Sequence, residues 1–302
     1  MLRVQWDIAL AGLGVGFVIG LTGMGGGALM TPVLVILFHV PASSAISSDI
    51  VASFFLKPIG GGVHIRKRTV NWTLVRWLAV GSVPAAFVGS YVIDQVASKG
   101  VENDIKEILG AVLLLAAAAM LVKVVVQSRR GPMPDVMMDQ RLVRPVPTAI
   151  VSVIGGFLVG MTSVGSGSLM IVMLMLLYPT LSSREMVGTD LVQAIPLVGA
   201  AALGHLLFGS LALGLTLSVL VGAMPGVYFG AHVSASASDR YIRPVLVAVL
   251  TISSLKLLNV SNGALLGASG LALAVLGALF LRSALRSRGR DREPLPEGVL
   301  AP

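Results

Sequence analysis

The sequence lacks cysteine entirely and carries few charged residues. Asp, Glu, Lys and Arg make up 12% of its 302 residues, whereas soluble domains carry about 25%. The absence of cysteine excludes disulfide bonds, thiolate catalysis and cysteine-ligated metal sites. Histidine is also scarce, and its four residues are dispersed along the chain, so the sequence predicts neither a metal site nor a cofactor.

Its glycine-containing runs do not match the motifs of nucleotide-binding or hydrolytic enzymes. No predicted strand precedes Gly12-x-Gly14-x-Gly16, and no acidic residue follows it at the distance that a dinucleotide site needs. The run Val164-Gly-Ser-Gly167 lacks the full G-x-S-x-G pattern of a nucleophile elbow. A P-loop is also missing. The sequence therefore predicts no catalytic residues and no ATP hydrolysis by this chain.

The uncharged residues form long apolar stretches. The chain is 55% hydrophobic with a mean hydropathy of +0.91, and each stretch is long enough to cross a bilayer core of about 30 Å. The stretches lie near residues 72–93, 108–126, 210–233, 242–258 and 263–281. The net charge of +8 is concentrated in a few loops, which indicates positive-inside topology rather than nucleic-acid binding. We expect an all-α polytopic protein of the plasma (inner) membrane.

A glycine-rich break occurs twice, at matching places in two apolar segments. The run Gly16–Met30 contains the pattern G-x-x-x-G-x-T-x-x-G-x-G, and the run Gly156–Met170 repeats it 140 positions later. A helix break inside a membrane leaves backbone amides unpaired, which is tolerated mainly where the break is buried in protein or lines a cavity. A duplicated break of this kind is typical of a transporter's binding site.

The duplication extends over most of the chain. After one inserted residue, Asp49 matches Asp190 and His64 matches His205 at an offset of 141. The pattern predicts five parts: a first transmembrane repeat over 1–127, a cytoplasmic linker over 128–147, a second repeat over 148–258, an extra C-terminal helix over 259–285 and a cytoplasmic tail over 286–302.

The charges of the loops favour two inverted repeats. Arg66-Lys67-Arg68, the linker and the arginine-rich tail are expected inside, whereas the acidic loop 94–107 is expected outside. All of these positions fit if 8–38 and 148–178 are glycine-broken re-entrant hairpins, each followed by about three transmembrane helices. The alternative is a chain of eight to nine full crossings; with nine, the tail lands outside.

The glycine breaks are candidates for binding a small anion. Helix N-termini at about residues 28 and 168 would present free amides and partial positive charge, and glycines let a ligand approach the backbone. The predicted substrate-binding residues at the breaks are Thr22, Gly25, Gly26, Gly27, Thr162, Gly165, Ser166, Gly167 and Ser168. The ladders Gly12-x3-Gly16-x3-Gly20 and Ser152-x3-Gly156-x3-Gly160 instead fit the small-xxx-small pattern of helix packing.

Lys57 is the one ionisable residue expected near the midplane of the membrane. It lies eight residues after Asp49 on the same predicted helix, and its repeat partner is Val198. An ionisable side chain at that depth is a functional hypothesis by default. We therefore include Lys57 in the predicted anion site; the alternatives are a salt bridge with Asp49 or a lysine reaching a wet vestibule.

Four further ionisable residues recur between the repeats. Asp49 and Asp190 are interpreted either as carboxylates that cap the helices predicted over 48–64 and 189–207 or as coupling carboxylates. His64 and His205 would lie at opposite faces under inversion, so they cannot share one site. Gating or interface roles are favoured for the two histidines over a proton relay.

The chain resembles the sulfite exporter TauE/SafE family, a group of anion permeases. The resemblance rests on the duplicated glycine run, the Ser-Ser-Asp49 segment and the loop His64-Ile-Arg-Lys-Arg68. It implies export or import of sulfite, sulfonates or related small organosulfur anions.

We therefore expect a secondary transporter working by alternating access and not an enzyme. Its expected partners are a small inorganic or organosulfur anion, protons or another coupling ion, and the lipid bilayer, with no nucleic acid. One alternative is an intramembrane enzyme acting on a lipid or a small metabolite, which would need several convergent ionisable groups. Another is a non-transporting subunit. The residues favour no particular anion, direction of transport, coupling ion or oligomeric state.

Overall fold

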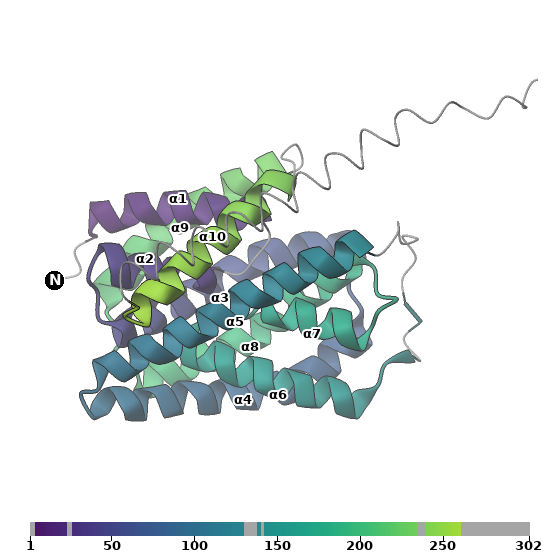
Figure 1. Cartoon of the computed structure of the whole chain (residues 1–302), viewed down its shortest axis with the longest axis horizontal. Helices are drawn as coiled ribbons and strands as arrows, with labels where there is room; N and C mark the ends of the chain where they lie inside the picture. Colours follow the sequence, from purple (N-terminus) through teal and green to yellow (C-terminus); the bar gives the residue numbers. More distant parts are fainter. Residues whose placement is uncertain (1–3, 23–25, 130–137, 140–141, 235–238, 261–302) are drawn as a thin grey trace, which may run out of the picture. The chain divides into compact units, whose positions relative to one another are not determined.

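The computed structural model describes residues 4–22, 26–129, 138–139, 142–234 and 239–260. Regular structure in these ranges is entirely helical (Figure 1). In chain order the helices are α1 (Trp6–Thr22), α2 (Gly27–Leu37), α3 (Ala42–Arg66), α4 (Trp72–Ser98), α5 (Glu102–Arg129), α6 (Pro145–Thr162), α7 (Leu169–Leu177), α8 (Ser183–Phe208), α9 (Leu213–Ser234) and α10 (Asp239–Leu257). The extra helix and the tail predicted after residue 259 lie outside the described residues, apart from 259 and 260.

Five described helices, α4, α5, α6, α8 and α9, are long and apolar enough to cross a membrane. The order α1 to α5 recurs as α6 to α10, with a short second helix each time, as the duplicated sequence predicts. The prediction of an all-α polytopic membrane protein is therefore confirmed at this level.

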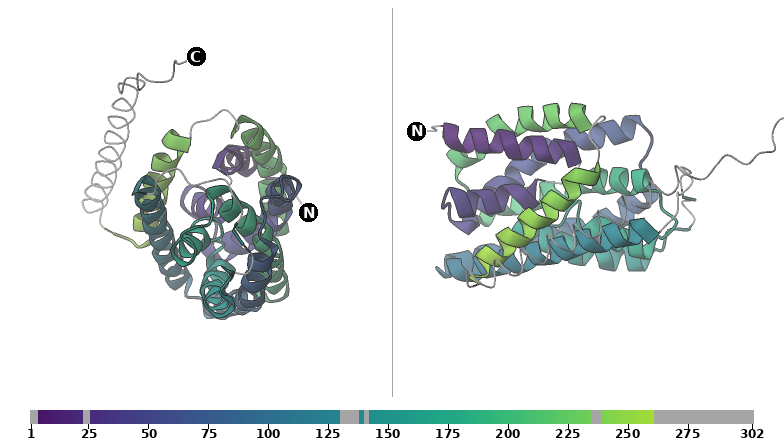
Figure 2. Two further views of the ribbon diagram at one scale, coloured as in Figure 1. Left: turned by 90° about the vertical axis from the view of Figure 1, so that its right-hand side faces the viewer. Right: turned by 45° about the horizontal axis from the view of Figure 1, so that its top comes forward.

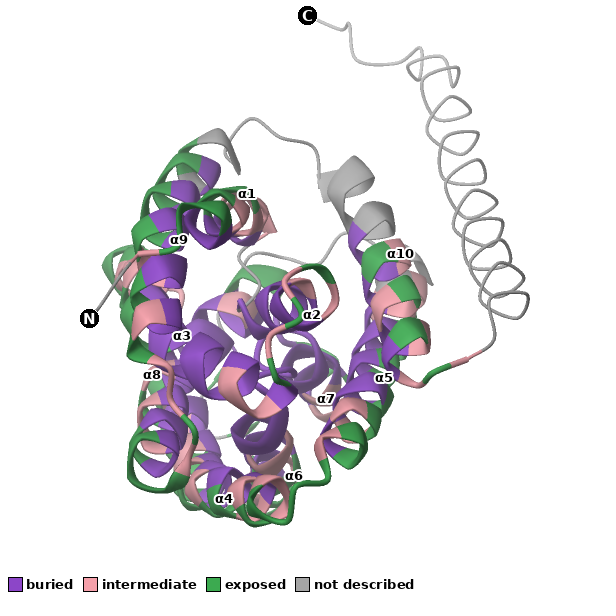
Figure 3. Ribbon diagram, turned by 90° about the vertical axis from the view of Figure 1, so that its left-hand side faces the viewer, coloured by how far each residue is buried: buried purple, intermediate pink, exposed green. Residues whose placement is uncertain are grey.

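Several polar and charged side chains are buried in an otherwise apolar interior, and many large apolar side chains are exposed on the outside. Asp49, Asp190 and Glu185 are buried, whereas Leu10 and Val80 are more than half exposed. Figure 3 shows the exposed surface on the outward faces of the longer helices, while α2 is largely buried among them. An apolar exterior of this kind suits lipid, which satisfies no backbone or charged groups.

The two repeats pack against each other through their first and fourth helices. On α1, Gly16 lies against α9, where an added Cβ atom would come within 2.6 Å of the Ala223 carbonyl oxygen. On α6, a Cβ atom added at the matching Gly156 would come within 2.4 Å of the Ser82 carbonyl oxygen of α4. Glycine lets the two backbones touch. The packing role predicted for the ladder glycines is confirmed for Gly12, Gly16, Gly156 and Gly160.

The contacts of these glycines also fix helix directions. On α1, Gly12 meets Val219 and Gly16 meets Ala223, so α1 and α9 run parallel. On α6, Gly156 meets Ser82 and Gly160 meets Ala86, so α6 and α4 also run parallel. The same pairing therefore occurs twice, with the roles of the two repeats exchanged.

The third helices of the two repeats pack antiparallel to each other. At one end of the α3–α8 pair Ser47 contacts His205, and at the other end His64 lies against Gly188. Outside them, α5 packs against α10, and Figures 1 and 2 show these two helices side by side.

Helix α2 turns back along α3. Gly26 lies beside Ser53 and Thr31 bonds Asp49, while Leu37 leads directly into the start of α3. Residues later in α2 thus lie beside residues earlier in α3, so the two helices are antiparallel. Both short helices consist mostly of buried residues. Their N-terminal ends therefore lie in the interior, where they position the candidate site.

Candidate functional site

The two glycine-rich breaks meet inside the bundle. A Cβ atom at Gly27, the first residue of α2, would overlap the carbonyl oxygen of Ser163 at the end of α6. Only glycine allows this approach, since even alanine would collide with backbone. The structure thus brings together two segments that the sequence predicts to contact one ligand.

The second break has an unusual backbone. Ser163 ends α6 in the left-handed conformation (φ 63°), and Gly165 and Gly167 also have positive φ values of 121° and 93°. Glycine adopts such angles at little cost. The Thr162 hydroxyl donates to the Leu158 carbonyl and accepts from the Val164 amide, so it supports the turn itself.

Lys57 reaches the second break from α3. Its ammonium donates to the Ser166 hydroxyl at 2.7 Å, and both side chains are buried. The structure therefore unites two residues of the predicted anion site that lie in different repeats. The alternative of a direct Lys57–Asp49 salt bridge is not observed. The hydrogen-bond partner of Lys57 is Ser166, and Asp49 acts on Lys57 through a longer-range electrostatic attraction.

Two carboxylates lie near Lys57. Asp190 and Asp49 both attract its charge, with Asp190 the stronger. The Gly167 amide donates to Asp190, and Thr31 donates to Asp49 at 2.7 Å. The expectation that no other ionisable group lies beside Lys57 is therefore wrong, because two carboxylates face it.

The capping interpretation of the two carboxylates is also wrong. α3 begins at Ala42 and α8 at Ser183, so Asp49 and Asp190 lie about two turns inside their helices. The cap of α8 is Ser182, which accepts from the Glu185 amide at 3.2 Å. Buried in mid-helix, both carboxylates are available to a ligand or to Lys57 instead.

The remaining predicted residues differ in their surroundings. The Thr22 hydroxyl donates to the Val18 carbonyl of its own helix at 2.8 Å. Gly26 and Ser168 are buried at the breaks, and Ser168 Oγ has no hydrogen-bond partner among the described residues. Gly25 lies outside the described residues.

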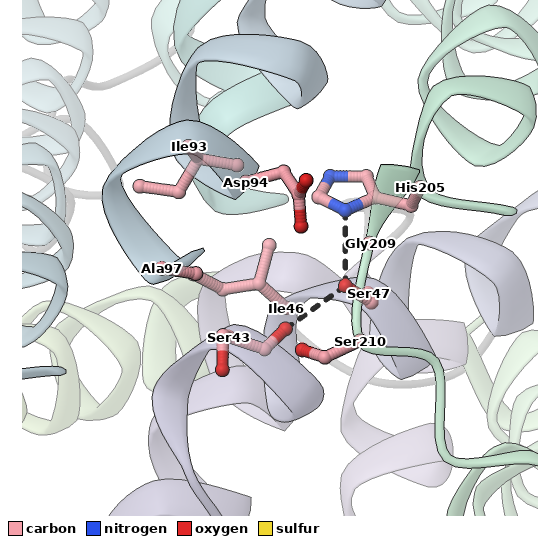
Figure 4. Close-up of a pocket in the computed structure, with 9 residues that line it drawn as sticks. All are labelled: Ser43, Ile46, Ser47, Ile93, Asp94, Ala97, His205, Gly209 and Ser210. Atoms are coloured by element: carbon pink, nitrogen blue, oxygen red, sulfur yellow. Dashed lines mark hydrogen bonds between the residues drawn. The ribbon is translucent and has the colours of Figure 1, made fainter. Parts of the chain in front are cut away.

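The two recurring histidines occupy opposite ends of the α3–α8 pair. His205 is 1% exposed; Ser47 Oγ and the Gly160 carbonyl lie 3.0 and 2.9 Å from its two ring nitrogens. Figure 4 shows His205 facing Asp94 in a small pocket of mixed polar and apolar lining. His64 contacts Thr69 at the other end. The structure thus separates the histidines from each other, as predicted.

Sequence reasoning missed two residues of this region. Thr31 bonds Asp49, and Ser53 faces Gly26 one turn further along α3. Neither recurs in the second repeat, where Ile171 and Ala194 stand at the matching positions. A search restricted to duplicated residues therefore passes over both. For Ser53, its position four residues after Asp49 on the same helix was the available signal.

Comparisons with known proteins identify a family of membrane transporters. The family model for the sulfite exporter TauE/SafE matches residues 8–257. The probable membrane transporter protein YjnA of Bacillus subtilis (strain 168) is 36% identical over 254 residues, which cover 83% of this chain and 99% of that protein.

Two more relatives come from the same organism. The probable membrane transporter protein YdhB is 25% identical over 80% of this chain and 96% of its own length. The probable membrane transporter protein YunE is 31% identical over 35% of this chain and 38% of its own length. No solved structure gives a significant match. By its match over nearly all of the described helices, this chain belongs to the sulfite exporter TauE/SafE family.

Proposed function

We propose that this chain is a secondary transporter that moves small anions such as sulfite or sulfonates across the plasma membrane. The observation that carries the proposal is the 2.7 Å bond from Lys57 to Ser166, which joins a buried cation to the opposite glycine break. Membership of the family and the names of the relatives support transport. The choice of anion follows the name of the family.

The anion site lies between the two breaks. The N-termini of α2 and α7 supply amides and partial positive charge there, and Lys57 supplies a full charge. Ser166 and Ser168 add hydroxyl donors, and Gly165 and Gly167 expose backbone. Gly26 and Gly27 complete the site from the first repeat, and Gly25, Thr22 and Thr162 remain predicted members.

The two repeats are inverted, and each contains a re-entrant hairpin. The support is directional: α1 is parallel to α9, α6 is parallel to α4, and α3 is antiparallel to α8. Because short loops join α8 to α9 and α3 to α4, the first repeat then runs opposite to the second. In this arrangement α1–α2 enters from outside and α6–α7 enters from the cytoplasm, where the linker and tail also lie.

Transport follows from exchange between the two entrances. Asp49 and Asp190 couple the anion to a second ion because they share Lys57 with it. His205 and His64 act as gates, one at each end of the α3–α8 pair. Rocking of one repeat against the other would open these ends in turn, which is how inverted repeats give alternating access.

An intramembrane enzyme is the second candidate, because two carboxylates, Asp49 and Asp190, converge on Lys57. The two functions differ in what happens to the anion. A transporter releases it chemically unchanged on the far side, whereas an enzyme converts it. We favour transport because the two relatives that match over nearly their whole length are named as probable membrane transporters.

The experiment is flux in proteoliposomes under a pH gradient. Sulfite, sulfoacetate and thiosulfate are offered to the wild type, to Lys57→Ala and to a control, Lys67→Ala, whose side chain is exposed. We expect unchanged anion to accumulate with the wild type and the control, and at least a tenfold loss with Lys57→Ala. No flux of any small anion would contradict the proposal, and conversion of the anion would favour the enzyme.

A further inference from the structure

The carboxylate of Asp49 lies among oxygen atoms that the anion site does not use. Thr31 Oγ1 donates to its Oδ2 atom at 2.7 Å, and the Ser163 hydroxyl also bonds the carboxylate. All three residues are at most 5% exposed. Helices α2, α3 and α6 therefore each contribute a buried oxygen at this point.

The backbone of Ser163 brings a carbonyl oxygen against Gly27, the residue next to Gly26. Ser163 ends α6, where carbonyl groups lack helical partners and carry the negative end of the helix dipole. Its carbonyl lies against Gly27, close enough that no side chain fits between them. In transporters, carbonyls at such helix ends hold coupling cations.

A further oxygen comes from Ser53. This side chain is 3% exposed, and its hydroxyl has no hydrogen-bond partner within the part of the chain that the structure describes. A Cβ atom at Gly26 would lie 3.3 Å from Ser53 Oγ and 3.7 Å from Asp49 Oδ1, so both oxygens border the same point. A buried hydroxyl without a partner needs one, and an ion or a water between it and the carboxylate would supply it.

The two matching carboxylates, Asp49 and Asp190, have unequal numbers of lysines near them. Asp190 is attracted by Lys57 and by Lys123, whereas Asp49, of the described charges, is attracted by Lys57 alone and less strongly than Asp190 is. A buried carboxylate is costly without a compensating cation. Around Asp49, hydroxyl and carbonyl oxygens therefore stand where Asp190 has a second lysine.

We propose that Asp49, Thr31, Ser53 and the carbonyl of Ser163 bind a monovalent alkali cation of about the size of sodium. Hard cations take oxygen ligands, and all of these ligands are oxygens. Resting on the proposed function, the inference adds that this cation is the coupling ion. Its charge neutralises Asp49, which would otherwise repel an anion held by Lys57.

Binding is tested without any organosulfur anion. The purified full chain is unfolded by heat in NaCl or in choline chloride at equal ionic strength and fixed pH. We expect sodium to raise the Tm saturably, by about 2–5 °C. Ser53→Ala and Thr31→Val should weaken this response at least fivefold in apparent affinity, and Asp49→Asn should abolish it.

Ser254→Ala is the matched control for Ser53→Ala, since it removes a buried hydroxyl of α10 that bonds the Thr251 carbonyl of its own helix, and it should keep the sodium response. If Asp49→Asn does not fold, Ser53→Ala and Thr31→Val still decide. Equal stability in sodium and choline overturns the cation site. A response to pH alone that depends on Asp49 also overturns it, because the carboxylate then takes a proton.

Flux separates this inference from the proposed function. Anion uptake that proceeds equally in sodium-free buffer overturns the coupling role while the transporter stands. A sodium-dependent Tm without flux of any anion supports the cation site and contradicts the transporter.

Discussion

At the scale of single residues, Gly14 and Gly16 on α1 form a matched pair. A Cβ atom at Gly16 would come within 2.6 Å of the Ala223 carbonyl, whereas at Gly14 it would meet nothing within 4 Å. Gly16→Ala should therefore destabilise the protein by about 1–3 kcal/mol, and Gly14→Ala should be neutral or stabilising. Thermal unfolding in detergent measures both. Equal Tm values for the two variants would contradict the close α1–α9 contact.

Single residues also mark the limit of the sequence argument. The packing glycines were predictable because their spacing of four is a property of one helix. The partnership of Lys57 with Ser166 was not, since 109 residues separate them. Asp49 was misread because the helix was predicted to begin at 48, whereas α3 begins at Ala42. In the structure Ser47 already donates to the Ser43 carbonyl within α3. The pattern Ser182-x-x-Glu185 fits a capping box and marks the true start of α8.

At the scale of elements, the direction of α8 against α3 can be read with cysteine pairs, since the chain has no cysteine of its own. Ser47 and His205 are in contact at one end, and Gly188 lies beside His64 at the other. Ser47→Cys with His205→Cys should form a disulfide on mild oxidation. Ser47→Cys with Gly188→Cys should not, although those positions match between the repeats. A mobility shift in non-reducing gels reports the outcome, and the reverse pattern would mean parallel helices.

The existence and order of the helices were predictable from hydropathy and the duplication. Their partners were not, because the faces of membrane helices are apolar toward lipid and toward protein alike. The pairing of α1 with α9 and of α4 with α6 depends on which small residues oppose which backbones. Such a match can be recognised only by comparing two segments that lie far apart in the sequence.

At the scale of the whole molecule, the choice between hairpins and full crossings is an experiment on sidedness. With hairpins, Lys67 is cytoplasmic and Ser210 is outside; with nine crossings, both are cytoplasmic. Basic loops favour the inside for Lys67. A membrane-impermeant maleimide should label Ser210→Cys in intact cells and Lys67→Cys only in inside-out vesicles. Labelling of both from the same side would contradict the inverted arrangement.

The exchange of first helices between the repeats has a consequence for biosynthesis. The amide of Gln5, just before α1, donates to Ser218 on α9, 213 residues away in the sequence. At synthesis rates of about 5–20 residues per second, α1 spends on the order of ten seconds or more in the membrane without this partner. Its glycine face is meanwhile open to wrong neighbours. Packing of α1 is thus completed only late in synthesis, when α9 has been made and inserted.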